Sequence, residues 1–186
     1  MNKQSWAATA VAGAALAMSA CSTTGATNAG SDAAADAGSA RAMLVTASGA
    51  DAGTAMVTVA GKKLRLNAEV KGMTPGPHGV HLHMVGRCDA PSFESAGGHW
   101  NPGRAQHGLD NPRGAHRGDL PNIDVGADGT GSLVATIDAA MIDGEGGLLD
   151  NDGAAFIVHA GRDDMVSDPA GNSGSRVACG VFNRTR

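Results

Sequence analysis

The sequence predicts an all-β domain, an eight-stranded antiparallel sandwich or barrel with two long loops. Short runs rich in β-branched residues recur along the chain, separated by Gly, Asp and Pro. No long stretch has the periodicity of an amphipathic helix. Hydrophobic residues make up 42% of the 186 residues, which is enough for the core of one domain of ordinary size.

The predicted strands begin just after residue 41. They are Ala42–Ala47, Thr54–Ala60, Lys63–Val70, Gly79–Val85, Leu120–Val125, Gly131–Ile137, Ala154–His159 and Arg176–Phe182. The run Lys63–Val70 alternates polar and apolar side chains, as a strand with one solvated face does. Ala127-Asp128-Gly129 predicts a hairpin turn, with Gly at the position that needs a positive φ. Residues 86–119 (the first long loop) and 160–175 (the second long loop) are long connections for an all-β domain, and such loops are usually functional.

The first 20 residues have the layout of a bacterial lipoprotein export signal. Lys3 lies in a short polar start, an apolar run of small residues follows, and Leu16 to Cys21 resembles a lipoprotein box. We expect cleavage before Cys21 and lipidation of its thiol; the alternative is an ordinary signal followed by an incidental cysteine. Residues 21–40 are small and polar and predict a flexible tether, which leaves 41–186 as the folded domain.

The charge of the chain excludes one large class of function. Its formal net charge is −4, and loss of residues 1–20 removes one Lys and no acid, which leaves −5. A sequence pI of about 5.9 argues against a basic nucleic-acid binder. Aromatic residues are only 3% of the chain, too few for the stacking platforms that single-strand binders use. From the predicted signal and lipoprotein box, we expect an exported protein of the periplasm or cell envelope, whose one membrane contact is the lipid on Cys21.

The histidines indicate one site. All seven lie between His78 and His159, inside or beside the long loops. His81 and His83 are two residues apart on a predicted strand, so their imidazoles share a face about 7 Å apart, and His159 ends a strand that can join them. The first long loop then supplies His99, His107, His116 and Asp119. Three imidazoles and a carboxylate form a closed set of the kind that Zn²⁺ accepts, and imidazole-rich sites suit copper and zinc.

Six motifs carry a resemblance to a known family. They are Pro77-His78-Gly79-Val80-His81-Leu82-His83, Gly97-Gly98-His99-Trp100-Asn101-Pro102, His107-Gly108, His116-Arg117-Gly118-Asp119-Leu120-Pro121-Asn122, Phe156-Ile157-Val158-His159 and Gly171-Asn172-Ser173-Gly174-Ser175-Arg176-Val177-Ala178-Cys179-Gly180-Val181. In this order they resemble the secreted bacterial branch of the copper/zinc superoxide dismutases, over about Arg41 to Asn183. The resemblance implies an immunoglobulin-like Greek-key barrel and an enzyme that converts superoxide to oxygen and hydrogen peroxide.

The resemblance also implies the site residues, with one copper and one zinc ion per subunit. Copper would be bound by His81, His83, His99 and His159, and zinc by His99, His107, His116 and Asp119. Asp163 would orient ligands of both metals, Cys88 and Cys179 would form a disulfide, and Arg176 would hold the superoxide anion. Copper would cycle between Cu(II) and Cu(I), with His99 released on reduction and supplying a proton to the departing peroxide.

Two other classes of protein compete with this interpretation. A related metal binder without turnover would typically lack a copper ligand, the disulfide or the arginine, and all of these are present in the sequence. A structural immunoglobulin-like module would have no reason to keep seven metal-binding side chains.

The resemblance does not identify which residue steers the substrate, and it does not fix the oligomeric state. Because the chain is acidic and superoxide is an anion, we expect at least one of Arg104, Arg113 and Arg117 to draw it inward. The eight Met are scattered and form no copper-carrying tract. The subunit is either a monomer or half of a homodimer.

Overall fold

The computed structural model describes residues 38–138 and 141–185, and these form nine strands and one short 3-10 turn. The strands are β1 (Ser39–Thr46), β2 (Asp51–Ala60), β3 (Lys63–Val70), β4 (Gly76–His78), β5 (Val80–His83), β6 (Ile123–Val125), β7 (Gly131–Asp138), β8 (Ala155–His159) and β9 (Arg176–Arg184). The turn η1 spans Glu94–Ala96. Every strand pair is antiparallel, so the predicted fold class is confirmed.

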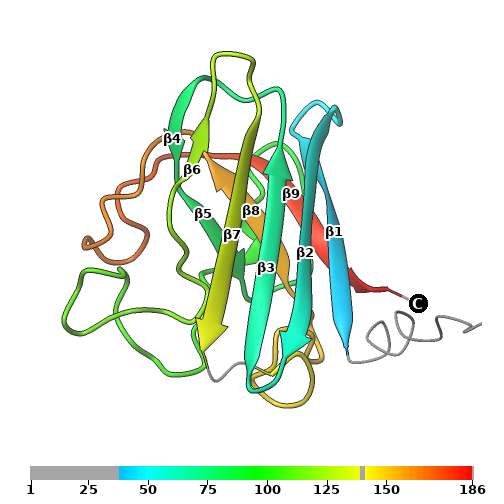
Figure 1. Cartoon of the computed structure of the whole chain (residues 1–186), viewed down its shortest axis with the longest axis vertical. Helices are drawn as coiled ribbons and strands as arrows, with labels where there is room; N and C mark the ends of the chain where they lie inside the picture. The colour runs from blue at the N-terminus through cyan, green and yellow to red at the C-terminus, as the bar shows by residue number, and fades with distance from the viewer. Residues whose placement is uncertain (1–37, 139–140, 186) are drawn as a thin grey trace, which may run out of the picture. The chain divides into compact units, whose positions relative to one another are not determined.

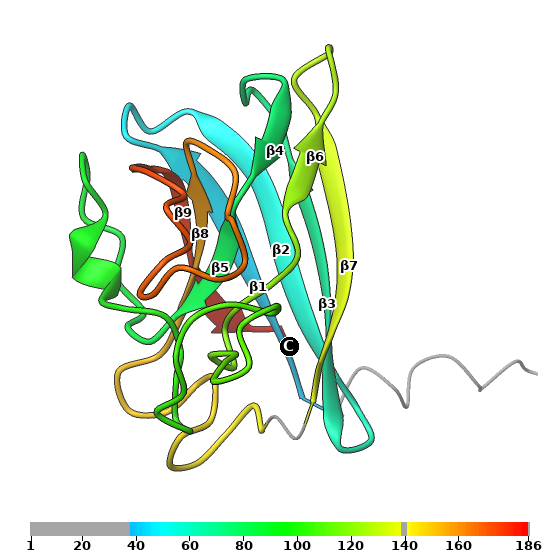
Figure 2. The ribbon, with the colours of Figure 1, turned by 90° about the vertical axis from the view of Figure 1, so that its left-hand side faces the viewer.

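The nine strands make one sheet that curves into a nearly closed barrel. Their order is β4-β6-β7-β3-β2-β1-β9-β8-β5. The two strands at opposite ends of this order, β4 and β5, are separated in sequence by Gly79 alone, so the edges of the sheet must approach each other. Figure 1 shows β1, β2, β3 and β7 in front of β5, β8 and β9, and Figure 2 shows the same two layers from the side.

The structure has nine strands where the sequence predicted eight, and several bounds differ: β2 begins at Asp51, not Thr54, and β9 ends at Arg184, not Phe182. The expected strand Gly79–Val85 is shorter, and a separate three-residue strand, β4, precedes it. Sequence reasoning missed β4 because it contains Pro77 and shows no alternation. The expected strand Leu120–Val125 begins only at Ile123, and β1 begins at Ser39, two residues inside the predicted tether.

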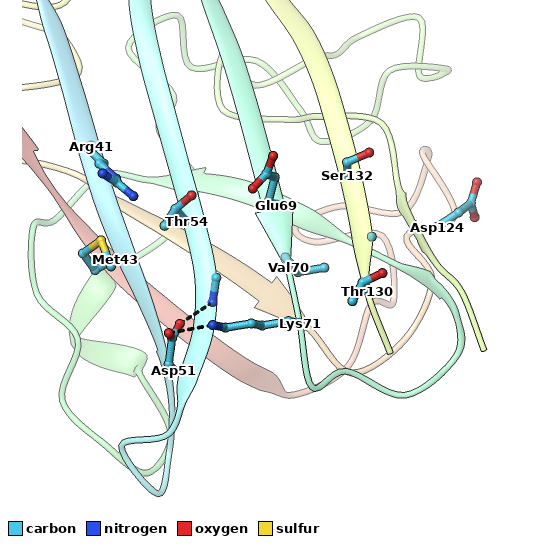
Figure 3. A pocket seen from close by; sticks show the side chains of 12 residues that line it. Arg41, Met43, Asp51, Thr54, Glu69, Val70, Lys71, Asp124, Thr130 and Ser132 are labelled. Atoms are coloured by element: carbon cyan, nitrogen blue, oxygen red, sulfur yellow. Dashed lines mark hydrogen bonds and ion pairs between the residues drawn. The ribbon is translucent and has the colours of Figure 1, made fainter. Parts of the chain in front are cut away.

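The front layer has one buried and one solvated face, as the alternation in β3 predicted. Leu64, Leu66, Ala68 and Val70 point into the core while the residues between them face outward. The turn before β7 has Gly129 at φ 77°, as expected for the hairpin. The outer face carries a polar groove, in which Lys71 pairs with Asp51 at 2.7 Å (Figure 3).

The back layer is buried on both faces, and this creates the setting of the site. Val80 and Leu82 of β5 and Phe156 of β8 point into the barrel core. On the opposite face a second apolar cluster forms where the first long loop covers the sheet, and it contains Phe93, Ala96, Ala155, Ile157 and Cys179. Cys88 joins Cys179 in the predicted disulfide, so this cover is bonded to β9.

The predicted export signal, Cys21 and residues 21–37 of the predicted tether lie outside the described residues. No helix in the part of the chain that the structure describes is long and apolar enough to cross a membrane.

Candidate metal centre

The outer face of β5 and the end of β8 supply the first three histidines. His81 and His83 lie on the same side of β5, with ring centroids 6.3 Å apart, close to the separation expected for alternate residues of a strand. His159 ends β8, which pairs with β5, and its ring centroid is 4.8 Å from that of His81. All three side chains are buried, because the long loops cover this face.

Backbone hydrogen bonds dock the first long loop against β5 and bring in the next ligands. The Trp100 N–H donates to the Leu82 carbonyl at 2.7 Å, and the Leu82 N–H donates to the Gly118 carbonyl at 2.9 Å. Gly118 permits this approach, because a Cβ there would overlap the Leu82 carbonyl oxygen. Their neighbours His99 and Asp119 are thereby placed beside the histidines of β5.

Four imidazoles converge with one free nitrogen each. His83 donates from Nδ1 to the Gly97 carbonyl, and His159 donates from Nδ1 to the Gly174 carbonyl, both at 3.0 Å. His81 donates from Nε2 to Asp163 Oδ2 at 2.6 Å. Since the other nitrogen of each ring then carries a lone pair, the ligand atoms available are His81 Nδ1 and Nε2 of His83, His99 and His159. All four are buried without a hydrogen-bond partner in the described chain, and they lie within 4.8 Å of one another.

A second group of ligand atoms surrounds Asp119. Its Oδ1 lies 2.8 Å from His99 Nδ1, 3.1 Å from His107 Nδ1 and 3.2 Å from His116 Nδ1. His99 Nδ1 and His116 Nδ1 are 3.3 Å apart. Ligand atoms about 2.0–2.1 Å from a tetrahedral zinc ion lie roughly 3.3 Å apart, so the spacing and the donor types of this group fit Zn²⁺. Asp119 is fixed by its Oδ2, which accepts the N–H groups of Gly108 and His116, each at 2.9 Å.

Asp163 connects the two groups. Its side chain is fully buried; Oδ2 accepts from His81 Nε2, and Oδ1 accepts from His107 Nε2 at 3.0 Å. Each bond directs the opposite nitrogen of that ring toward a ligand group. The neighbouring Asp164 is exposed and accepts N–H groups of its own loop instead. The structure therefore distinguishes the two adjacent carboxylates, which the sequence alone could confuse.

The electrostatics keep His81 and His159 neutral and the carboxylates charged, as metal binding requires, whereas His107 is held protonated and must release a proton before it can bind a metal. Burial lowers the pKa of His81 to about 3 and that of His159 to about 4. Burial opposes ionisation of Asp119 as well, but hydrogen bonds from His107 and His99 outweigh it and lower its pKa. Burial also disfavours charge on His107, yet its bonds to Asp119 and Asp163 raise its pKa to about 9.

Arg176 lies at the opening above the first group. Its Nη1 donates to the Phe93 carbonyl and its Nη2 to the Gly97 carbonyl, both at 2.7 Å. A cavity of about 500 Å³ is lined by this guanidinium together with His83, His99 and His159. The guanidinium is thus held rigidly beside the free imidazole nitrogens, in position to attract a small anion.

Of the four arginines in the first long loop, Arg87 pairs with Asp89 at 2.7 Å, and the other three have different positions. Arg104 lines the same cavity as Arg176. Arg117 lies over the ring of Trp100, with its guanidinium carbon 5.7 Å from the ring centroid, and lines a different hollow beside β7. Arg113 is exposed on the loop. Arg104 is therefore the cation best placed to act on a molecule entering the cavity.

Sequence reasoning missed several residues that build the site. The Asn122 side chain donates to the Asp163 carbonyl at 2.9 Å and accepts the Asp163 N–H at 2.8 Å, which clamps the backbone of that residue. The Gly97 carbonyl serves both His83 and Arg176. Asp168 accepts the His107 N–H at 2.7 Å and so ties the second long loop to the first. Asn122 lies in a quoted motif, but no local pattern signals any of these contacts.

Comparisons with known proteins agree with this geometry. A family profile described as copper/zinc superoxide dismutase (SODC) matches residues 51–182. A copper-zinc superoxide dismutase of Caulobacter vibrioides is 43% identical over 148 residues, 77% of this chain and 85% of that protein. One of Deinococcus radiodurans is 40% identical over 154 residues, 76% of this chain and 82% of that protein. A crystal structure of a superoxide dismutase-like protein from Bacillus subtilis superposes with a TM-score of 0.71 at 38% identity and covers 76% of this chain and 96% of the other.

Proposed function

Because this chain belongs to the copper/zinc superoxide dismutase family and is an oxidoreductase acting on superoxide with copper and zinc as cofactors, we propose that the two ligand groups described above are its metal sites. Copper is held by His81, His83, His99 and His159, and zinc by His99, His107, His116 and Asp119. The convergence of four buried, unpaired imidazole nitrogens in the described chain is the observation that carries this assignment. A buried imidazole nitrogen that binds neither a metal nor a hydrogen-bond donor would lose its hydration free energy without a compensating interaction.

The histidine shared by the two groups links the metals. His99 offers Nε2 to the first group and Nδ1 to the second, so with both metals bound it would be shared between them as an imidazolate. When bound, copper supplies the one-electron exchange with superoxide, and zinc, which is not redox-active, supplies positive charge and holds the loop. His99 lines the cavity, so its Nε2, when not bound to a metal, could take up a proton there and pass it to a peroxide anion leaving the site.

Arg176 and Arg104 act on the substrate before the electron transfer. Arg176 presents a fixed guanidinium to superoxide at the cavity, because both of its terminal nitrogens are anchored to carbonyl groups. Arg104 adds a second positive charge to the same opening. Since the whole molecule is negative, these two charges provide the local attraction that an anionic substrate needs.

We further propose that the enzyme works outside the cytoplasm and protects the cell envelope from superoxide. Residues 1–20 act as the export signal, lipid on Cys21 anchors the protein, and residues 21–40 let the domain stand away from the membrane. The Cys88–Cys179 disulfide supports this location, because such bonds persist in oxidising compartments.

Metal analysis together with a superoxide-decay assay tests the assignment. The wild type is expected to hold one copper and one zinc ion per chain and to accelerate superoxide decay. His159→Ala removes a ligand of the first group only, so it should lose copper and activity while zinc stays bound. His116→Ala should release zinc first. Full activity in protein free of copper would overturn the assignment, and bound copper without superoxide decay would indicate a metal binder instead.

The role of Arg104 has its own test. Neutralising it, in Arg104→Gln, removes one of the two cations that line the cavity. A unit charge about 8 Å from the substrate in a water-like medium contributes about 0.5 kcal/mol of attraction. The kcat/KM of Arg104→Gln should therefore be about twofold below that of the wild type at low ionic strength and equal to it at high salt. Arg113→Gln, outside the cavity, is the matched control. Equal salt dependence in wild type and Arg104→Gln contradicts the proposed steering.

A further inference from the structure

A methionine stands at the opening of the metal site. Met84 directly follows His83, and 48% of its surface is exposed. It lines the same cavity as His83, His99 and His159, the histidines whose Nε2 atoms have no hydrogen-bond partner in the described chain. Its side chain is thus exposed both to solvent and to the opening above the buried ligand atoms.

The charge of this opening suits an anion and disfavours a metal cation. Arg176 and Arg104 both line it, so a cuprous ion approaching the buried imidazoles meets two guanidinium groups. A thioether binds Cu(I) through a soft, uncharged sulfur, and this bonding does not depend on a negative site. Among the residues that line this cavity, Met84 is the one with a sulfur donor, which suits Cu(I) even where the local charge repels a cation.

The side chain of Met84, half of whose surface is exposed, packs beside a glycine. The side chain passes over Gly97, where a Cβ would lie 3.2 Å from Met84 Cγ and 3.9 Å from Sδ, so a side chain at that position would crowd it. The Gly97 carbonyl beneath it holds both His83 and Arg176. A long, unbranched thioether can turn between solvent and the cavity about its three side-chain bonds.

From this placement we propose that Met84 is a capture ligand for Cu(I), which binds the ion at the opening and passes it to the Nε2 atoms of His83 and His159. The inference rests on the proposed copper site and adds the route by which that site is filled. It concerns loading only, because the four imidazoles complete the ligand set without the sulfur. The scattered methionines of the sequence thus include one that the fold brings to the copper site.

The test measures copper uptake rather than enzymatic activity. Zinc-loaded, copper-free protein is mixed without oxygen with the coloured bicinchoninate complex of Cu(I), and the loss of colour is followed in time. Met84→Leu preserves volume and removes the sulfur. Met43→Leu is the matched control, because Met43 is 56% exposed but lines grooves away from the histidines. The same variants are also loaded with Cu(II), which prefers imidazole to thioether ligands.

The expected result is specific to Cu(I). Met84→Leu should take up Cu(I) about tenfold more slowly than wild type, while its final copper content and its rate with Cu(II) stay unchanged. Met43→Leu should load at the wild-type rate. Cu(I) uptake by Met84→Leu at the wild-type rate, or equal slowing with both oxidation states, overturns the capture role while leaving the copper site intact. A wild-type protein that ends without bound copper overturns the proposed function itself.

Discussion

The Cys88–Cys179 disulfide allows a quantitative prediction, because it links residues 91 positions apart. Closing a loop of that length removes about 15–16 cal/mol/K from the entropy of the unfolded chain, which corresponds to about 4.6 kcal/mol at 25 °C. We expect the double variant Cys88→Ala/Cys179→Ala to lose about 4–5 kcal/mol of unfolding free energy. For a domain of this size, the loss corresponds to a fall in Tm of about 10–15 °C.

Loss of the disulfide should also lower the activity toward superoxide. The disulfide holds the first long loop against β9, and this loop carries the Phe93 and Gly97 carbonyls that anchor Arg176. Without the bond, the guanidinium is less well oriented, so kcat/KM for superoxide should fall while copper and zinc remain bound. The fall should not exceed that of Arg176→Ala, which removes the guanidinium altogether.

Urea unfolding of the metal-free protein, followed by the fluorescence of the buried Trp100, measures the loss of unfolding free energy in the double variant. Wild-type protein kept in a reductant that opens the disulfide is the control and should match the double variant. A loss smaller than 1 kcal/mol would refute the loop-closure argument. Unchanged kcat/KM in the variant would show that Arg176 keeps its orientation without the covalent tie.

Three further predictions concern the groups behind the ligands. Asp163→Asn removes a carboxylate that orients rings of both groups, so metal affinity should fall about 10–100-fold in competition with a chelator, and unchanged affinity contradicts the orienting role. Gly171→Ala places a Cβ where it overlaps the Asp163 carboxylate. Gly174→Ala also has a positive φ, 81° against 61°, but its Cβ meets only Ala160 at an ordinary contact distance of 3.9 Å. Only the first should weaken zinc binding, and equal effects in a zinc titration would indicate backbone strain alone. Burial keeps the pKa of His81 at about 3 and that of His159 at about 4 in the fold, against about 6.5 when unfolded, so the unfolded chain binds more protons below pH 6.5. The free energy of unfolding of the metal-free protein should therefore fall as the pH drops from 6.5 to 4. These two histidines alone contribute a slope of up to about 3 kcal/mol per pH unit, and a flat urea midpoint over this range contradicts the prediction.

Local patterns in the sequence were sufficient for the fold class and for part of the site. The alternation in Lys63–Val70 predicted which side chains of β3 are buried, because the side-chain period of a strand is two residues. The same rule placed His81 and His83 on one face. The full ligand sets and the disulfide were implied by the family resemblance that six motifs carry, and the structure brings the ligand residues together in two groups and joins the two cysteines.

The sequence by itself therefore determined most of the strands, the cluster of metal-binding side chains and the acidic charge of the chain. Only the tertiary structure decided which nitrogen of each imidazole faces the metal, since that depends on partners such as Asp163, which lies 82 residues from His81. It also selected Arg104 among the loop cations and placed Met84 at the opening. These outcomes depend on how the two long loops fold over the back layer, and contacts between distant segments leave no periodic signal in the chain.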